Sequence, residues 1–180
     1  MDKRVLIAFS GGQKVGYLLD LLAHVAAREG SAFGYYMPTP VSRSACSQAA
    51  FVCIGEQTAC KEFLPQTAHV LLALEELEGR RTVRYARQDA NLILCSCHRL
   101  PMAVAVGTTG YPTDILYRMQ TEGRNVWQVK RTEMVDAFVA AMLLRALGYD
   151  SDTAGVILTE VGLNLAPEQL AAAYAKEYSK

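Results

Sequence analysis

The sequence predicts a single α/β domain over residues 1–180, a three-layer α/β/α arrangement around a largely parallel sheet. Short apolar runs typical of strands alternate with helix-period segments through the first two-thirds of the chain. Helical segments then gather in the C-terminal third. A chain of 180 residues has the length of one domain, and no internal repeat, low-complexity tract or linker divides it.

The first predicted unit is a strand, a tight glycine turn and a helix, in the stretch RVLIAFSGGQKVG. Residues 5–9 are all apolar, and the letters SGGQ follow them directly. Residues 15–28 then carry a helical apolar stripe, with His24 on the opposite face expected to be solvated, and Gly30 can end the helix. A helix that begins near Gln13 would turn the backbone N–H groups of the turn toward a site where an anion can bind.

Two further strands are predicted without a helix between them. Residues 32–37 and 47–55 both read as extended apolar segments, separated by PTPVSRSA at 38–45. The prolines and serines of that stretch predict a loop, which carries a single charge at Arg43. Strands connected in this way can pair antiparallel, so we expect some antiparallel strands in the sheet.

The next strand and helix carry polar features. Residues 67–74 form an apolar strand interrupted by His69, which we expect to be a hydrogen-bonded structural residue rather than a ligand. Residues 75–88 are charged and are predicted to be helical. Four arginines cluster there, at Arg80, Arg81, Arg84 and Arg87. A solvated face paired in part with Glu75, Glu76 and Glu78 is the favoured interpretation, and a phosphate-binding patch is the alternative.

The remaining elements are mostly helical. The predicted strands and helices occupy, in order, residues 90–97, 113–122, 125–129, 132–147, 151–161 and 167–178. A turn at 107–112 precedes the first of these helices, which Thr113 can cap, and Thr132 can cap the second. Pro167 suits the first position of the last helix. Trp127, the only tryptophan, is expected to pack in the interior.

Composition and charge exclude several classes of function. Lys+Arg and Asp+Glu both number 18, so no global field attracts nucleic acid or an anionic membrane. No apolar run reaches the roughly 20 residues that cross a bilayer, and the N-terminus lacks the long apolar stretch of a secretory signal. We therefore expect a cytoplasmic protein. An apolar content of 51% fits a well-filled core and equally a surface buried against a partner.

The cysteines number five, at positions 46, 53, 60, 95 and 97. An odd number without an export signal argues against a disulfide framework, and no spacing matches an iron–sulfur pattern. In an extended strand Cys95 and Cys97 would share one face and His98 would take the other. A metal site there would need two more ligands, so buried thiols are favoured and no metal ligand is assigned.

Taken alone, the glycine turn matches no nucleotide or nucleophile motif. The patterns G-x-G-x-x-G, G-K-[ST] and G-x-S-x-G are all absent. One interpretation is a tight turn with glycine at positive φ, which the turn by itself favours. The other is a backbone cradle for a phosphate or carboxylate. No nucleophile–base pair emerges, so no catalytic residue is assigned.

Four stretches, in order, resemble one family. SGGQKVGYLLDLLAHVAAREG resembles the opening G-x-GGQG-V…G of the gamma-type subunit of 2-oxoacid:ferredoxin oxidoreductases, which is called beta in the indolepyruvate branch. PTPVSRSACSQAAFVCIG resembles the family's G-x-x-x-RGG-x-x-x-x-x-V-R-I-G stretch. TAHVLLALEELEGRRTVRYARQDANLILCSC resembles its A-D-V-L-L-A-L-E strand with the helix and strand that follow, and RTEMVDAFVAAMLLRALG resembles K-x-x-N-x-V-x-L-G-A-L. The resemblance covers nearly the whole chain.

The resemblance implies a non-catalytic subunit of an enzyme that oxidatively decarboxylates a 2-oxoacid to an acyl-CoA and passes electrons to ferredoxin. Arylpyruvates such as indolepyruvate are the expected substrates, because the two-subunit branch uses a small chain of this size. Thiamine diphosphate, Mg²⁺ and [4Fe-4S] clusters are expected in a large catalytic partner, with CoA as co-substrate and none of them held by this chain. The two loops expected to face that partner or the acyl/CoA region supply Gly11, Gly12, Gln13, Lys14, Arg43 and Ser44.

Several positions depart from the family pattern. Lys14 replaces the last glycine of GGQG, and Ser44 and Ala45 replace both glycines of RGG. His69 stands where the family has Asp, and Asp136 where it has Asn. Side chains in the loops restrict how closely a backbone can approach a ligand. These departures motivate a second hypothesis, a scaffold or binding subunit of another redox complex. A third is a free-standing enzyme that binds a small molecule or nucleotide.

Overall fold

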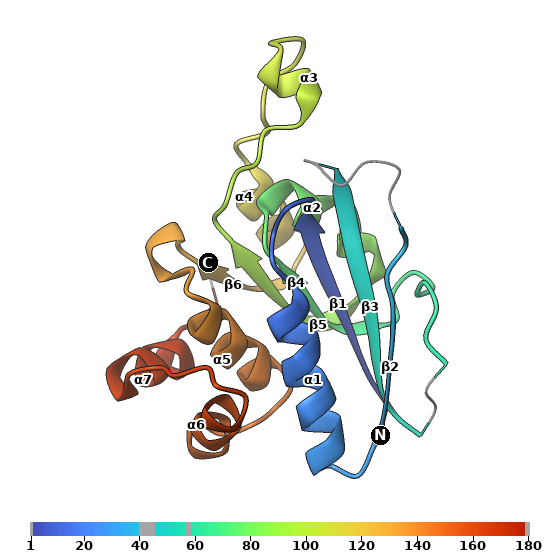
Figure 1. The fold of residues 1–180 in the computed structure, drawn as a ribbon. Coiled ribbons are helices and arrows are strands. Elements are labelled where there is room, and N and C mark those ends of the chain that lie inside the picture. Colours follow the sequence, from blue (N-terminus) through green and yellow to red (C-terminus); the bar gives the residue numbers. More distant parts are fainter. Residues whose placement is uncertain (1, 40–45, 57–58, 179–180) are drawn as a thin grey trace.

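The computed structural model describes residues 2–39, 46–56 and 59–178. The strands in these ranges are β1 (Lys3–Ser10), β2 (Ala32–Tyr36), β3 (Ser47–Gly55), β4 (Ala68–Ala73), β5 (Ala86–Cys95) and β6 (Asn125–Val129). They form one sheet in the order β2-β3-β1-β4-β5-β6 (Figure 1). β1, β4, β5 and β6 pair in parallel, whereas β3 is antiparallel to both β1 and β2. The mostly parallel sheet with antiparallel strands is confirmed.

β1 lies inside the sheet and is buried on both faces. Val5, Ile7 and Phe9 pack into one apolar cluster, and Leu6 and Ala8 pack into the other. Successive side chains of a strand point to opposite faces, so a strand covered on both sides requires an unbroken apolar run. The apolar run of β1 therefore contributes to two cores, one on each side of the sheet.

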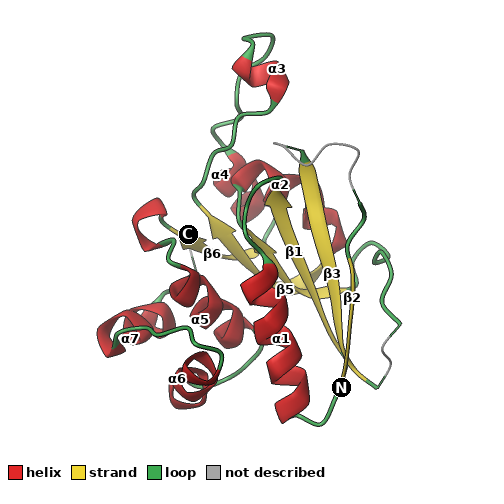
Figure 2. Cartoon of the chain, viewed as in Figure 1, coloured by secondary structure: helices red, strands yellow, loops and turns green. Residues whose placement is uncertain are grey.

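Helices cover both faces of the sheet, which confirms the three layers (Figure 2). Within the described ranges, the helices on one face are α1 (Gly16–Arg28), α5 (Asp136–Ala146), α6 (Ser151–Glu160) and α7 (Pro167–Ala175). The other face carries α2 (Glu76–Thr82) and α4 (Ile115–Thr121). In the part of the chain that is described, no helix is both long and apolar enough to cross a membrane.

The exposed polar face of α1 forms ion pairs with a helix from the C-terminal third of the chain. His24 Nε2 lies 2.7 Å from Glu160 Oε2, and Arg28 Nη1 donates to both oxygens of the same carboxylate at 2.8 Å. Glu160 ends α6, so these bonds tie the C-terminal helices to α1. His24 lies at the surface as expected, with its side chain 34% exposed, whereas its partner Glu160, 136 residues further along the chain, was not predicted.

The helix predicted over residues 75–88 is shorter. α2 ends at Thr82, a 3₁₀ turn (Val83–Tyr85) follows, and β5 already begins at Ala86. The carbonyls of Arg84 and Tyr85 accept hydrogen bonds from the N–H groups of Gln66 and Thr67. Because these carbonyls bond to a distant loop, they cannot continue the helical ladder, and Arg87 lies on a strand instead.

Other boundaries also differ from the predictions. α4 begins at Ile115 with Asp114, not Thr113, at its N-cap, and α5 begins at Asp136 rather than after Thr132. Residues Arg131–Glu133 form a 3₁₀ turn, in which the Lys130 N–H donates to the Glu133 carboxylate at 2.8 Å. β5 ends at Cys95, α7 ends at Ala175, and the short helix α3 (Met102–Ala105) was not predicted.

Candidate functional site

The candidate site lies at the carboxyl edge of the parallel strands. β1 continues through α1 on one face of the sheet, whereas the adjacent β4 continues through α2 on the other face. In open α/β sheets, ligands bind outside the carboxyl ends of strands where successive connections leave in opposite directions. The segments that meet here follow β1, β4 and β5.

The glycine turn after β1 is closed by bonds within the chain. The Gly11 N–H donates to the Cys46 carbonyl at 2.8 Å, and the Gln13 N–H donates to the Ser10 carbonyl at 3.0 Å. Gly12 has φ +88°, a conformation that strains any residue with a Cβ. α1 begins only at Gly16, not near Gln13, so the turn stands apart from the first helical turn.

Gln13 joins the ends of two strands through its side chain. The Ser10 N–H donates to Gln13 Oε1 at 2.8 Å, and Gln13 Nε2 donates to the Leu74 carbonyl at 2.9 Å. Ser10 ends β1, and Leu74 follows β4. The amide of Gln13 is therefore occupied by the scaffold.

A pocket of about 250 Å³ opens beside this turn. Lys14 and Arg99 are the cations among its lining residues, and Asp136 is the carboxylate. Arg99 Nη1 donates to the Gly11 carbonyl at 3.3 Å, and a Cβ on Gly12 would lie 3.4 Å from the same nitrogen. A Cβ at that distance would be in ordinary van der Waals contact, so it is the positive φ of Gly12, and not the guanidinium, that favours glycine here. Two cations in one pocket suit an anion.

Tyr17 lines the same pocket from the first turn of α1. Burial raises the pKa of its hydroxyl, and the charge of Asp136 raises it further. The phenol therefore stays protonated at neutral pH and can donate a hydrogen bond into the pocket.

Two buried carboxylates at the start of α2 hold the chain that follows β5. The Glu75 carboxylate caps α2 by accepting the Glu78 N–H at 2.8 Å, and it also accepts the Arg99 N–H at 3.3 Å and the Tyr111 hydroxyl. Glu76 lies 3.1 Å from His98 Nε2, and the His98 ring packs on Tyr111 with centroids 4.7 Å apart. Both ends of the segment 98–111 are therefore clamped to α2, with Arg99 positioned at the pocket.

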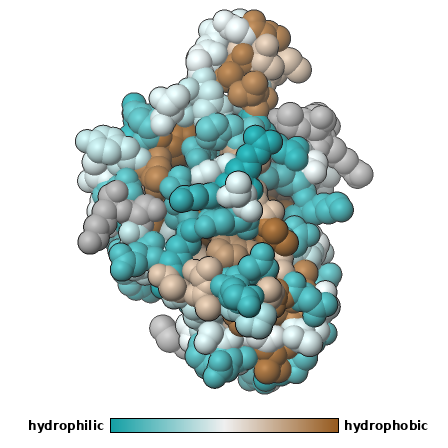
Figure 3. Space-filling model, turned by 90° about the vertical axis from the view of Figure 1, so that its left-hand side faces the viewer, coloured by the Kyte–Doolittle hydropathy of each residue, from teal (hydrophilic) through white to brown (hydrophobic). Residues whose placement is uncertain are grey.

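Between these clamped ends the chain forms an arm that projects from the carboxyl edge (Figure 1). We call residues 98–113, which include α3, the arm. Its residues 100–113 carry no charge. Leu100, Met102 and Val106 are 53%, 75% and 63% exposed, and Figure 3 shows apolar side chains gathered at the projecting tip. An exposed apolar cluster of this kind marks an interaction surface.

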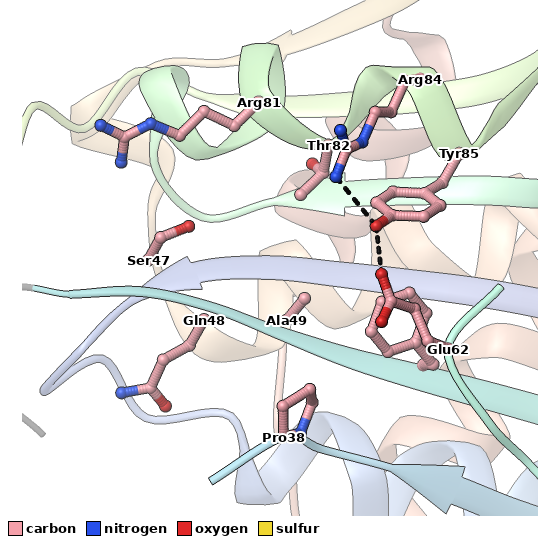
Figure 4. Close-up of a pocket in the computed structure, with 10 residues that line it drawn as sticks. Pro38, Ser47, Gln48, Ala49, Glu62, Arg81, Thr82, Arg84 and Tyr85 are labelled. Atoms are coloured by element: carbon pink, nitrogen blue, oxygen red, sulfur yellow. Dashed lines mark hydrogen bonds between the residues drawn. The ribbon is translucent and has the colours of Figure 1, made fainter. Parts of the chain in front are cut away.

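A second pocket, of about 280 Å³, lies on the opposite face of the sheet between β3 and the turn after α2. Figure 4 shows Arg84, Tyr85 and Glu62 joined by hydrogen bonds at one end, with Ser47 and Arg81 at the other. Arg81 pairs with Glu78 at 2.6 Å. Arg81 therefore has a carboxylate partner, whereas Arg84 donates to the neutral Tyr85 hydroxyl, which in turn donates to Glu62.

The predicted arginine cluster divides: Arg81 and Arg84 line the pocket in Figure 4, whereas Arg80 and Arg87 are not among its lining residues. Arg80 pairs with Glu122 at 2.7 Å, Arg81 with Glu78, and Arg87 with Asp89 at 2.9 Å. The paired face was the favoured interpretation and is confirmed, although only Glu78 of the three expected glutamates takes part; the other two hold the arm. The four guanidinia do not converge on one phosphate site.

The histidine and cysteine predictions have mixed outcomes. His69 Nδ1 accepts the Arg4 N–H at 3.0 Å, as expected of a structural residue. Trp127 and Cys95 are buried as expected, but Cys97 lies beyond the end of β5, so the two thiols do not share a strand face. Among the described residues, no three His, Cys, Asp or Glu side chains are grouped so as to hold a metal ion.

Of the six site residues predicted from sequence, Gly12, Gln13 and Lys14 line the pocket at the carboxyl edge, and Gly11 lies beside it. Arg43 and Ser44 lie outside the described residues. Sequence reasoning did not identify Arg99, Glu75 or Tyr17. The sequence did contain a signal for Arg99. This residue follows a predicted strand, and the carboxyl ends of parallel strands lie at the same edge of the sheet as the glycine turn.

The fold and the site define an open α/β domain with its pocket at the strand switch point. Among solved structures, this fold is shared with subunit PORC of pyruvate oxidoreductase from Thermotoga maritima, at 14% identity and a TM-score of 0.58 over 96% of this chain and 90% of that one. The gamma subunit of a keto/oxoacid ferredoxin oxidoreductase from Geobacter sulfurreducens matches at 12% identity and a TM-score of 0.55, over 97% and 93% of the two chains.

A third similar structure is the 2-oxoglutarate:ferredoxin oxidoreductase of Magnetococcus marinus, solved with 2-oxoglutarate, coenzyme A and succinyl-CoA bound. The identity is 15% and the TM-score 0.57, over 96% of this chain but only 29% of that one, so the fold there is one part of a longer protein. A scan against models of protein families and a search of curated proteins both find no match. At these identities the likeness establishes the fold.

Proposed function

We propose that this chain is the small, non-catalytic subunit of a 2-oxoacid:ferredoxin oxidoreductase. The observation that carries the proposal is the fold, which along 96–97% of the chain is shared with subunits of two such enzymes and with one part of a longer chain in a third. The four ordered sequence stretches support it independently, because their resemblance to the family rests on residue identities rather than on the path of the backbone. Thiamine diphosphate, Mg²⁺ and iron–sulfur clusters would belong to a large partner chain, with ferredoxin as electron acceptor.

The arm supports a partner interaction at the carboxyl edge. Its uncharged tip would be buried against the large subunit, and Arg99 at its base would then bring the pocket of Lys14 and Gly12 to the interface. Gly11, Gly12, Gln13, Lys14, Arg43 and Ser44 would face the catalytic partner or CoA, whose phosphates suit the two cations. Indolepyruvate and related arylpyruvates are the proposed substrates.

Purification of the tagged chain from its native host tests the proposal. The expected result is a complex with a large chain that shows iron–sulfur absorbance, contains thiamine diphosphate and reduces ferredoxin when a 2-oxoacid and CoA are added. Among pyruvate, 2-oxoglutarate, phenylpyruvate and indolepyruvate, the last two should give the highest kcat/KM. A lone monomer without such a partner would contradict the proposal.

The arm is tested separately within that complex. Met102→Glu should weaken association with the large subunit by more than about tenfold, because a carboxylate would be desolvated at the interface. Val156→Glu is the matched control, since Val156 is 50% exposed on α6, away from the arm. Equal affinities of the two variants would show that the arm lies outside the interface.

A second candidate, a scaffold subunit whose catalytic connection is lost, is favoured by the closed turn. The Gly11 N–H and the Gln13 amide already bond within the chain, and Lys14 occupies a glycine position of the motif. Lys14→Gly and Arg43→Ala would then leave turnover of the complex unchanged. A large loss of turnover in Arg43→Ala would instead place that loop in the catalytic region.

A further inference from the structure

Two cysteine sulfurs meet at the side of the sheet, away from the candidate site. Cys53 Sγ on β3 lies 3.2 Å from Cys60 Sγ, in the segment that follows β3. A disulfide bond measures about 2.05 Å, so the two sulfurs need to approach by roughly 1 Å. Residues 59–67 belong to no helix or strand, so this segment can make that approach without breaking a ladder.

The two thiols differ in their surroundings. Cys53 lines two pockets, together with Arg4 and Ala59, and both Cys53 and Cys60 are partly exposed. Cys60 donates its S–H to the Phe51 carbonyl at 3.1 Å. Burial, followed by the neighbouring Cys53 sulfur, raises the pKa of Cys60 to about 12. A small oxidant can therefore reach the pair, and the Cys60 thiol is held beside Cys53 by its hydrogen bond to the Phe51 carbonyl.

We propose that Cys53 and Cys60 form a reversible redox site that switches the segment 59–67 between a covalently cross-linked state and the state seen here, which only non-covalent contacts hold. A hydroperoxide transfers one oxygen to the Cys53 sulfur, which becomes a sulfenic acid as the alcohol or water leaves. The Cys60 sulfur then displaces that oxygen as water. The two sulfurs lose two electrons in forming the S–S bond, the peroxide O–O bond is reduced, and both thiol protons end in the released products. A dithiol reductant reverses the change by exchange.

A cross-link at Cys60 would affect the pocket in Figure 4, because Glu62 of the segment 59–67 lines that pocket. Glu62 accepts the Tyr85 hydroxyl, and Phe63 packs edge-on against Phe51 with ring centroids 5.2 Å apart. Glu62 and Phe51 both line the pocket in Figure 4. A bond between Cys60 and β3 would anchor this wall of the pocket two residues from Glu62. The inference does not depend on the proposed function.

The test uses the full chain, reduced and then titrated with hydrogen peroxide. Peptide mapping should find one Cys53–Cys60 cross-link, lighter than the dithiol by two hydrogen atoms and reopened by dithiothreitol. Amide exchange over residues 59–67 should slow by about tenfold or more in the oxidised protein. Cys53→Ser and Cys60→Ser should each abolish the cross-link, and Cys97→Ser is the matched control that keeps it.

Two results on the unmodified protein would overturn the proposal, so it does not depend on the folding of any variant. One is that Cys53 and Cys60 both stay reduced, and can still be alkylated, at peroxide concentrations that oxidise other cysteines. The other is a cross-link that leaves amide exchange over 59–67 unchanged, which would remove the switch.

Discussion

Gln13 shows at the scale of one residue how a glycine turn becomes part of the scaffold. Its side chain accepts from Ser10 and donates to the Leu74 carbonyl, so one amide links the carboxyl ends of β1 and β4. Lys14 and Arg99, the two cations of the pocket, lie beside the turn that this amide holds in place.

Gln13→Ala should therefore lower the free energy of unfolding by about 1–3 kcal/mol, because the Ser10 N–H and the Leu74 carbonyl lose their partners. Urea denaturation measures the effect. Lys14→Ala, at the adjacent exposed position, should stay within about 0.5 kcal/mol of the wild type. Equal losses in the two variants would show that the bridge does not contribute to stability.

His69 gives a pH dependence at the same scale. Burial lowers its pKa, and the charges of Arg87 and Arg4 lower it further, while its neutral ring accepts the Arg4 N–H. Since the folded pKa lies below the ordinary value near 6.5, the unfolded chain binds more protons in acid. The contribution of His69 is complete above the unfolded pKa and is lost as pH falls toward the folded pKa.

The urea midpoint should accordingly fall between pH 7.5 and pH 5, and the fall should be smaller in His69→Asn, whose amide oxygen can still accept the Arg4 N–H without titrating. The difference between the two proteins isolates His69 from the other histidines. An identical pH profile for both would contradict this role.

At the scale of elements, α2 packs unusually close to the sheet through Gly79. A Cβ added there would lie 2.7 Å from Leu94 Cδ1 and 2.9 Å from the Ala73 Cβ, both of which are buried. The closeness brings Glu75 and Glu76 down to the carboxyl edge, where they hold the arm.

Gly79→Ala should destabilise the fold by about 1–3 kcal/mol through overpacking, although alanine is the better helix former by about 1 kcal/mol. Gly16→Ala is the control in a helix with open space, since nothing lies within 4 Å of its added Cβ. Thermal denaturation of both variants measures the contrast. A neutral Gly79→Ala would mean that α2 shifts outward at little cost.

At the scale of the whole molecule, the C-terminal segment closes over the edge strand β6. Tyr178 stacks on Trp127 with centroids 4.7 Å apart and planes 8° apart, and its hydroxyl donates to Asn91 at 2.9 Å. Arg145 lies over the Trp127 ring and donates to the carbonyls of Ala173 and Lys176. Tyr178 and Arg145 therefore cover the single tryptophan.

Removal of residues 176–180 should expose Trp127, shift its fluorescence to longer wavelength and lower the melting temperature. Because the chain has one tryptophan, the signal reports this site alone. Tyr178→Ala should reproduce part of the red shift, and Tyr117→Ala, an exposed residue on α4, should leave the spectrum unchanged. An unshifted spectrum in the truncated protein would contradict the closure.

The sequence by itself determined the elements whose signals are local. The apolar run before the glycine turn, the alternation of strands and helices up to β6 and the apolar stripe of α1 all appear in neighbouring residues, so the strands, the C-terminal helices and the three layers could be predicted. The sequence also determined that Gly11 to Lys14 lie at the edge of the sheet, because a turn that follows a parallel strand lies at the carboxyl end of that strand.

The tertiary structure alone decided which distant groups meet. Arg99 reaches the glycine turn across 88 positions, Glu160 finds His24 and Arg28 on α1, and the arm is held by carboxylates that the sequence pattern assigned to a solvated helix face. The end of α2 was also decided this way, by carbonyls that bond to a loop. Local propensity records only the preferences of adjacent residues, whereas these partners are selected by the register of the sheet and the packing of helices on it.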